Sequence, residues 1–233
     1  MTYLLVNLGS IAIPLLFSFE KRLKFYKNWK FLFPAIFITG VFFLVWDYFF
    51  TQWGVWGFNE MHLLGVYVLG LPIEELMFFF CIPYACVFGY EVLNHFIKRD
   101  LLGKYSMKIT IFLIAFLAFQ AYLYRGLAYT FATCLFGTLF LLVQLFVFKT
   151  KKLGRFYLAY LVLLIPFLVV NGILTGTGIE EEVVWYNNNE NLSIRMLTIP
   201  IEDVFYGMLL ILMNLTIYEH LKERANAAIG NVS

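Results

Sequence analysis

Charged residues are scarce in this sequence, since Asp, Glu, Lys and Arg make up 14% of its 233 residues, whereas a globular domain carries roughly 25%. Hydrophobic residues account for 62% of the chain, so a water-soluble fold would have to bury nearly all of its side chains. This composition excludes intrinsic disorder and a small disulfide scaffold. The net charge of +2 is too small to indicate a nucleic-acid partner, and we expect none.

Cysteines and recognisable ligand motifs are also few. Cys81, Cys86 and Cys134 lie inside apolar runs at no spacing that suits a metal or a redox pair, so we interpret them as reduced filling residues. The three histidines form no i, i+4 pair on a helix. Glycine motifs of the Walker or dinucleotide type are missing, and so are the Asp-rich pairs of a magnesium-dependent prenyl transferase. We therefore expect neither a metal nor a cofactor.

Long apolar windows dominate what is present. A membrane helix needs about 20 mainly apolar residues, within a range of about 17–25. Seven windows qualify: 3–19, 31–50, 73–93, 107–124, 127–148, 156–174 and 201–219. In the first window the basic residues follow the apolar stretch, unlike in a secretory signal, so we interpret it as the first membrane helix. The sequence predicts an all-α, polytopic membrane protein with about seven transmembrane helices.

Basic residues are distributed unevenly between the two sides of this arrangement. With seven spans, Arg125 and Arg195 fall on one side and the remaining 15 of the 17 lysines and arginines fall on the other. The positive-inside rule then places the N-terminus outside and the C-terminus in the cytoplasm. We expect a multi-pass protein of the cell inner membrane.

The chain repeats itself at an offset of 128 residues. LPIEELMFFFCIPYACVFGYEVL at 71–93 aligns without a gap with IPIEDVFYGMLLILMNLTIYEHL at 199–221, and upstream VWGFN at 55–59 resembles VWYN at 184–187. An odd linking helix makes the two repeats parallel in the bilayer. By analogy with its polar counterpart, we expect the apolar stretch 51–71 to be interfacial or re-entrant. We predict a first three-helix repeat at 1–96, a linking helix at 97–126, a second three-helix repeat at 127–224 and a polar tail at 225–233.

Each repeat opens its third helix with a proline and two adjacent acids. The acids are Glu74 and Glu75 in the first repeat and Glu202 and Asp203 in the second. Acids in a first turn commonly do no more than complement the helix dipole. Here they lead directly into an apolar span, where a carboxylate costs about 2.5–3.5 kcal/mol on insertion scales. A protonated acid beside an ionised one is the arrangement of a general acid and base, so we interpret the pairs as functional.

Aromatic rings surround these acids. Phe78 and Tyr206 lie one turn further along the same helices, and Trp46 and Trp185 lie on the approaching segments. Packing alone explains any single ring equally well. Together with paired acids, rings that stabilise a cation by roughly 0.5–2 kcal/mol each predict a dry pocket for carbocation chemistry on a hydrocarbon.

Two further polar pairs recur in the repeats. Asp47 and Asn171 occupy matching places at the outer ends of the second and sixth helices, where they are candidates to orient the acids by hydrogen bonds. Glu91 and Glu219 lie 17 residues beyond the acids, which is about 25 Å along a helix. We interpret these two glutamates as structural residues at the cytoplasmic boundary, where they can pair with basic loops.

The PIEE motif at 72–75 and the PIED motif at 200–203, each opening a membrane helix after a loop with Trp and Asn, resemble the membrane-integral lycopene cyclase domain. The resemblance covers essentially the whole chain, arranged as the fused form of two small subunits. It implies a cofactor-free lycopene beta-cyclase, an isomerase of the intramolecular lyase class. Such an enzyme protonates the ψ ends of lycopene and closes β-ionone rings in carotenoid biosynthesis.

The resemblance also implies roles for the acids. Glu74 and Glu202 are expected to be the acid and the base, in an order left open, while Glu75 and Asp203 tune or relay the proton. A C40 polyene is about as long as the hydrocarbon core is thick, so its two ends cannot reach the outer side together. We therefore predict one composite site between the halves, in which Glu74 and Glu202 act together on the two ends in turn.

Two alternatives remain open from the residues. A related isoprenoid enzyme such as a hydratase would quench the same cation with water. A non-catalytic lipophile transporter also accounts for parallel repeats and paired intramembrane acids. The expected partners are lycopene or a related carotenoid and the lipid bilayer, while the choice of β or ε ring and the oligomeric state stay undecided by the sequence.

Overall fold

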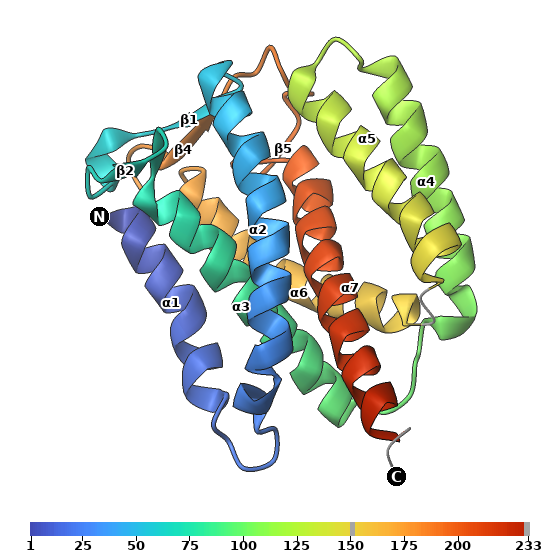
Figure 1. The fold of residues 1–233 in the computed structure, drawn as a ribbon. Helices are drawn as coiled ribbons and strands as arrows, with labels where there is room; N and C mark the ends of the chain where they lie inside the picture. Colours follow the sequence, from blue (N-terminus) through green and yellow to red (C-terminus); the bar gives the residue numbers. More distant parts are fainter. Residues whose placement is uncertain (150–151, 231–233) are drawn as a thin grey trace.

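In the part of the chain that the structure describes, seven α-helices account for most residues, and short strands cap one end of the bundle (Figure 1). The computed structural model describes residues 1–149 and 152–230. Within that part the helices are α1 (Thr2–Phe17), α2 (Trp29–Gln52), α3 (Ile73–Phe96), α4 (Ser106–Leu123), α5 (Ala128–Val143), α6 (Leu153–Leu174) and α7 (Glu202–Gly230). Each predicted window overlaps one of these helices, which confirms the all-α, polytopic membrane class.

Six of the described helices, α2 to α7, are long and apolar enough to cross a membrane. The α1 helix is also apolar but has 16 residues, a length of about 24 Å against a hydrocarbon core about 30 Å thick. A π-helical turn, Gln144–Phe148, extends α5. The α7 helix continues to Gly230, so the predicted polar tail at 225–233 is helical up to that residue. Residues 231–233, like Lys151 of the basic side, lie outside the described residues.

The segments that precede α3 and α7 form short antiparallel strand pairs at the same end of the bundle (Figure 1). The strands are β1 (Trp56–Phe58), β2 (Tyr67–Val68), β3 (Leu71–Pro72), β4 (Val184–Tyr186), β5 (Arg195–Met196) and β6 (Ile199–Pro200). The β2–β3 and β5–β6 hairpins lead directly into α3 and α7, so both acidic motifs begin at this end. The stretch 51–71, predicted to be interfacial or re-entrant, begins inside α2, which ends at Gln52, and residues 53–71 contain no helix long enough to span a membrane.

The strands β1 and β4 pair around two residues that are counterparts at the offset of 128 residues. Gly57 lies opposite Trp185, its own counterpart at that offset. The amides of Asn59 and Asn187 donate reciprocally, each at 2.9 Å, to a valine carbonyl in the opposite loop. The structure therefore aligns residues 55–59 with 183–187 without a gap, which corrects the predicted alignment by one position. A Cβ on Gly57 would lie 2.3 Å from the Trp185 ring, so this close approach requires glycine.

A second set of reciprocal contacts joins α3 to α7 at the opposite end of the bundle. The Tyr90 hydroxyl donates to Glu219 at 3.1 Å, and the Tyr218 hydroxyl donates to Glu91 at 2.6 Å. Each glutamate also pairs with a lysine at 2.5 Å, which is Lys222 for Glu91. These contacts agree with the predicted structural role of the two glutamates.

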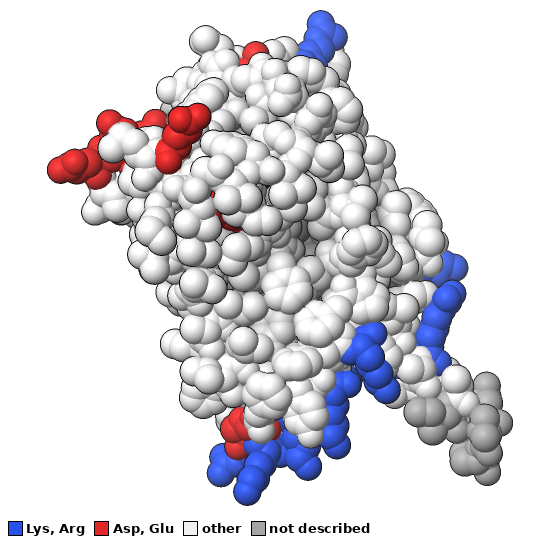
Figure 2. All heavy atoms as spheres, turned by 60° about the vertical axis from the view of Figure 1, so that its left-hand side comes forward, with Lys and Arg blue, Asp and Glu red and all other residues white. Residues whose placement is uncertain are grey.

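Charged side chains gather toward the two ends of the molecule (Figure 2). Acidic side chains cluster near the strand end, and most of the visible lysines and arginines lie toward the opposite end. A wide uncharged band separates the two groups. Such a band suits the hydrocarbon core of a bilayer.

Candidate active site

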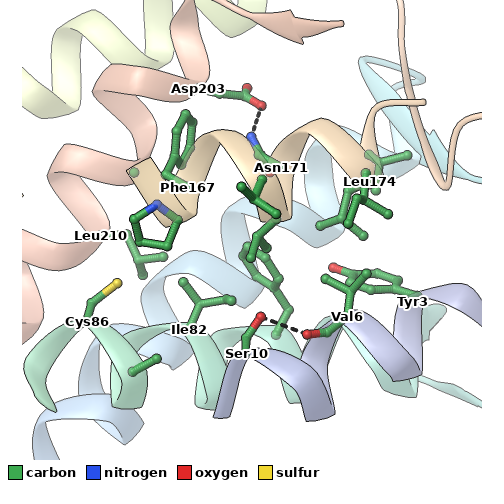
Figure 3. Close-up of a pocket in the computed structure, with 18 of the residues that line it drawn as sticks. Tyr3, Val6, Ser10, Ile82, Cys86, Phe167, Asn171, Leu174, Asp203 and Leu210 are labelled. Atoms are coloured by element: carbon green, nitrogen blue, oxygen red, sulfur yellow. Dashed lines mark hydrogen bonds between the residues drawn. The ribbon is translucent and has the colours of Figure 1, made fainter. Parts of the chain in front are cut away.

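A cavity of about 840 Å³ lies between α1, α3, α6 and α7 (Figure 3). Along α3 it runs from Glu75 to Gly89, which at 1.5 Å per residue is about 21 Å. Most of its wall is apolar. The polar groups gather at the end near the strands, where the lining residues are Tyr3, Asp47, Glu75, Tyr129, Asn171, Tyr186, Asp203 and Tyr206.

The cavity opens sideways, between α1 and α6. Leu5 and Ile13 on α1 and Val169 on α6 line it, and these three side chains are 61–67% exposed. These exposed side chains are apolar, so this opening suits contact with lipid. A hydrocarbon can therefore enter the cavity without crossing water.

The first repeat contributes two carboxyl groups to the polar end. The Tyr3 hydroxyl on α1 donates a hydrogen bond to Glu75 Oε2 at the start of α3. Asp47, near the end of α2, accepts a hydrogen bond of 2.5 Å at Oδ1 from the indole of Trp56. Its Oδ2 is buried and has no hydrogen-bond partner among the described residues. Both acids line the cavity, and the charge of Asp47 acts on the Glu75 carboxyl.

The second repeat contributes one carboxyl group held by three donors. Asp203 Oδ1 accepts from the Tyr129 hydroxyl on α5, and Oδ2 accepts from the Asn171 amide at 2.6 Å and the Tyr186 hydroxyl at 3.1 Å (Figure 3 shows the Asn171 bond). Tyr186 lies in β4, outside the helices. Burial, with the neighbouring Asp203 and Glu75 carboxyl groups, raises the pKa of Tyr186 well above its usual range, so this phenol keeps its proton.

The other acid of each pair turns away from the cavity toward a loop. Glu74 accepts the backbone N–H of Leu64 at 2.6 Å, and Glu202 accepts that of Leu192 at 2.8 Å, which is ten residues upstream in both cases. Thr130 also donates to Glu202 at 2.6 Å. Both glutamates are buried, and neither lines the cavity. Adjacent residues on a helix face different directions. One acid of each pair therefore lines the cavity, and the other accepts a hydrogen bond from a loop.

Of the four aromatic rings predicted to surround the acids, two line the cavity and two do not. Phe78 and Tyr206 line the cavity. Trp46 is buried behind Tyr206, with ring centroids 5.1 Å apart, and does not reach the cavity wall. Trp185 is 39% exposed and lies over Gly57 at the strand end of the bundle.

Sequence reasoning missed four residues that bind or line the polar end: Tyr3, Tyr129, Tyr186 and Trp56. One signal was available, because Tyr3 and Tyr129 both stand at the start of the first helix of their repeat. For Tyr186 and Trp56 the corrected alignment of the loops was needed. In that alignment Phe58 is the counterpart of Tyr186 at the offset of 128 residues, while the strand pairing places Trp56 opposite Tyr186.

The repeat is broken at the cavity itself. Gly207 on α7 lines the cavity, and its counterpart at the offset of 128 is Phe79 on α3, which is buried. The Phe79 ring packs against Phe43 on α2 at 5.9 Å, and Phe43 in turn packs against Trp46 at 5.7 Å. In the first repeat, aromatic rings therefore fill the space that corresponds to the cavity beside Gly207.

Buried carboxyl groups at the end of an apolar cavity that opens into lipid define a membrane protein that presents ionisable groups to a hydrophobic ligand. The sequence model of the lycopene cyclase family, described as lycopene cyclase, matches residues 1–93 and 126–221. The chain belongs to this family, which confirms the resemblance and gives it a cyclase role in carotenoid biosynthesis, with a carotenoid substrate and a lipid environment. No curated protein and no solved structure matches the chain.

Proposed function

We propose that the protein is a lycopene beta-cyclase, an isomerase that closes the ψ ends of lycopene into β-ionone rings without a cofactor. One observation carries the proposal: carboxyl groups from both repeats line the polar end of an apolar cavity whose rim carries exposed apolar side chains. An acid and a base placed there can act on a substrate that never leaves the membrane. The family match supports the carotenoid substrate.

For each ring that forms, the substrate first gains one proton and later loses one proton. A carboxyl group adds H⁺ to the terminal C=C bond, which forms one C–H bond and leaves a tertiary cation. The nearby internal double bond attacks that cation and forms the ring C–C bond, which moves the positive charge to the next carbon. A carboxylate then removes H⁺ from the adjacent carbon, and the C–H electrons become the ring double bond. The formula is unchanged and no oxidant is required.

The rings at the polar end suit the cationic steps. Phe78 and Tyr206 line the cavity, and so does Trp56, which packs 6.2 Å from Tyr206. Aromatic faces stabilise a nearby cation by up to about 2 kcal/mol each when water is excluded. Few polar groups other than the carboxyl and phenol groups lie there to capture the cation.

The acids that act on the substrate in this proposal are Glu75 and Asp203, because they line the cavity. Glu74 and Glu202, to which the resemblance assigned proton transfer, instead anchor loops. The site remains composite, since each repeat contributes one of the two acids. The cavity is about 21 Å long along α3, shorter than a C40 polyene that matches a core about 30 Å thick, so one end group reacts while the rest of the chain extends into lipid.

We further propose that residues 1–96 and 127–224 are two parallel repeats joined by a linking helix. The reciprocal contacts of β1 with β4 and of α3 with α7 support this division. The distribution of charge in Figure 2 supports an N-terminus outside and a C-terminus in the cytoplasm of the cell inner membrane, with the site near the outer surface.

Expression in a lycopene-accumulating host tests the function. The wild type should convert lycopene to ring products of the same mass, and Glu75→Gln and Asp203→Asn should each lower the yield of the normal ring product at least tenfold. Glu180→Gln, which changes an exposed acid outside the cavity, is the matched control and should keep wild-type yield.

The same assay distinguishes the alternatives. Products that gain oxygen indicate a hydratase. Purified protein in detergent should still convert lycopene, because a cyclase needs no gradient, whereas a transporter would leave the pigment chemically unchanged. Unchanged lycopene with folded wild-type protein refutes the proposal.

A further inference from the structure

The two halves of the polar end carry different chemistry. Asp47 on α2 corresponds to Asn171 on α6, so the first repeat has two carboxyl groups at the cavity and the second has one. Glu75 accepts a hydrogen bond from Tyr3, whereas Asp203 accepts three. A site whose two halves were equivalent would not distinguish the acid from the base. The differences between these two halves do distinguish them.

Two carboxyl groups in the first half disfavour double ionisation. Asp47 is 2% exposed and Glu75 is 6% exposed, and the charge of one acts on the other. Like charges that share an apolar site cannot both ionise readily, so such a pair holds a proton. The Asp47 Oδ2 atom is buried and has no hydrogen-bond partner among the described residues, so nothing there compensates a negative charge on that oxygen.

Asp203 is 3% exposed, so burial opposes its ionised form as it does for Glu75, but more donors offset that effect at Asp203 than at Glu75. An amide and two phenols donate to its two oxygens, and hydrogen bonds to the charged form of a carboxyl group stabilise that form. One of these donors, Tyr186, holds its proton because burial raises its pKa. The neighbouring acid, Glu202, is turned toward Leu192 and Thr130.

We infer that Glu75, paired with Asp47, delivers the proton that starts the reaction, and that the Asp203 carboxylate removes the proton that ends it. The inference rests on the proposed function and assigns the two roles within it. Glu75 gives H⁺ to the terminal double bond and is left as a carboxylate beside the Asp47 carboxylate, an arrangement that favours the return of a proton to the pair. Asp203 receives H⁺ as the ring double bond forms. The proton balance closes when this proton passes back to the Glu75–Asp47 pair before the next turnover. Asp47 acts through Glu75 as a positioning residue.

The two roles predict different failures. Without the acid, no cation forms, so Glu75→Gln should leave lycopene unconverted, at least 100-fold below wild type. Without the base, the cation still forms but loses a proton from another carbon or captures water. Asp203→Asn should therefore consume lycopene and yield ring isomers with a displaced double bond, or hydroxylated rings.

Asp47 has its own expected result. Asp47→Asn should lower kcat at least tenfold without raising KM, and its product should be the normal ring. The conservative variant Asp47→Glu should restore part of the rate, which a role in packing alone would not predict. Glu180→Gln again serves as the control, and size-exclusion chromatography in detergent checks that each variant is folded.

Two further variants keep the test decisive if Asp203→Asn does not fold. Asn171→Leu and Tyr186→Phe each remove one donor from Asp203 and should give the same displaced products in smaller amounts. The inference is overturned if folded Asp203→Asn leaves lycopene untouched, or if Glu75→Gln produces the displaced isomers. Wild-type protein that does not cyclise lycopene contradicts the proposed function instead, so the two failures are distinguishable.

Discussion

Replacing Gly207 with phenylalanine tests whether the substrate occupies the cavity. A Cβ at this position would meet Phe167 and the Tyr160 hydroxyl at 3.6 Å, which is ordinary contact, so Gly207→Ala fits without a clash. A phenylalanine ring must extend further, into the cavity that Gly207 lines. The counterpart Phe79 shows that the equivalent helix position in the other repeat carries this ring.

The size of the effect follows from the area of the ring. A buried phenylalanine covers about 150–250 Å², and at about 25 cal/mol per Å² its displacement by substrate costs about 4–6 kcal/mol. At 1.4 kcal/mol per tenfold, Gly207→Phe should weaken substrate binding roughly a thousandfold or more. Gly207→Ala should keep its activity and gain up to about 1 kcal/mol of stability from helix propensity.

Pigment extraction from a lycopene-producing host measures the conversion, and thermal unfolding in detergent measures the stability. The expected outcome is folded Gly207→Phe with no ring product beside active Gly207→Ala. Wild-type conversion by a folded Gly207→Phe variant would show that the substrate does not lie in this cavity.

Other substitutions separate structural from chemical roles. Glu74→Gln and Glu202→Gln each weaken a hydrogen bond from a loop N–H, so each should lower the free energy of unfolding by about 1–2 kcal/mol. Both variants should keep a measurable rate of conversion. Complete loss of activity at an unchanged melting temperature would contradict this expectation. Glu91→Gln removes an ion pair between α7 and α3 and should cost about 1.5–3 kcal/mol, seen as a lower melting temperature with an unchanged product pattern. Gly57→Ala forces the ring opposite it to move and should destabilise the strand cap by about 1–3 kcal/mol, and an unchanged melting temperature would show that the ring shifts freely. The pKa of Tyr186 is raised above the ordinary value of about 10 for tyrosine, so its phenol stays protonated up to about that pH. On titration up to about pH 10, wild type and Tyr186→Phe should therefore show the same tyrosinate absorbance.

The loss of symmetry at the cavity is the feature that most affects the chemistry. Two parallel repeats could in principle form two equivalent sites. Here Gly207 leaves space on one flank, whereas Phe79 and the rings around it fill the other. The substitution of Asn171 for Asp47 then distinguishes the remaining carboxyl groups. Duplication supplied the framework, and a few divergent residues made its two halves unequal.

The sequence by itself determined the helices and the motif that matters. Apolar windows of about 20 residues form membrane helices because every backbone group must be hydrogen-bonded within the segment, so the seven windows could be predicted. The offset of 128 residues identified the acidic pairs, since both are placed in the first turn of a helix after a proline. Phe78 and Tyr206 could be found at the same offset. Asp47 and Asn171 could be found from their matching places near the ends of the second and sixth helices.

Only the tertiary structure decided which acid of each pair meets the cavity. Adjacent helical residues point about 100° apart, so the choice depends on the rotation of α3 and α7, which their packing against α1 and α5 sets. Tyr3 and Tyr129 belong to those distant helices, and Tyr186 comes from a strand cap that no local periodicity predicts. The space beside Gly207 likewise exists only because side chains from separate helices fail to fill it, and such packing is a property of the assembled bundle.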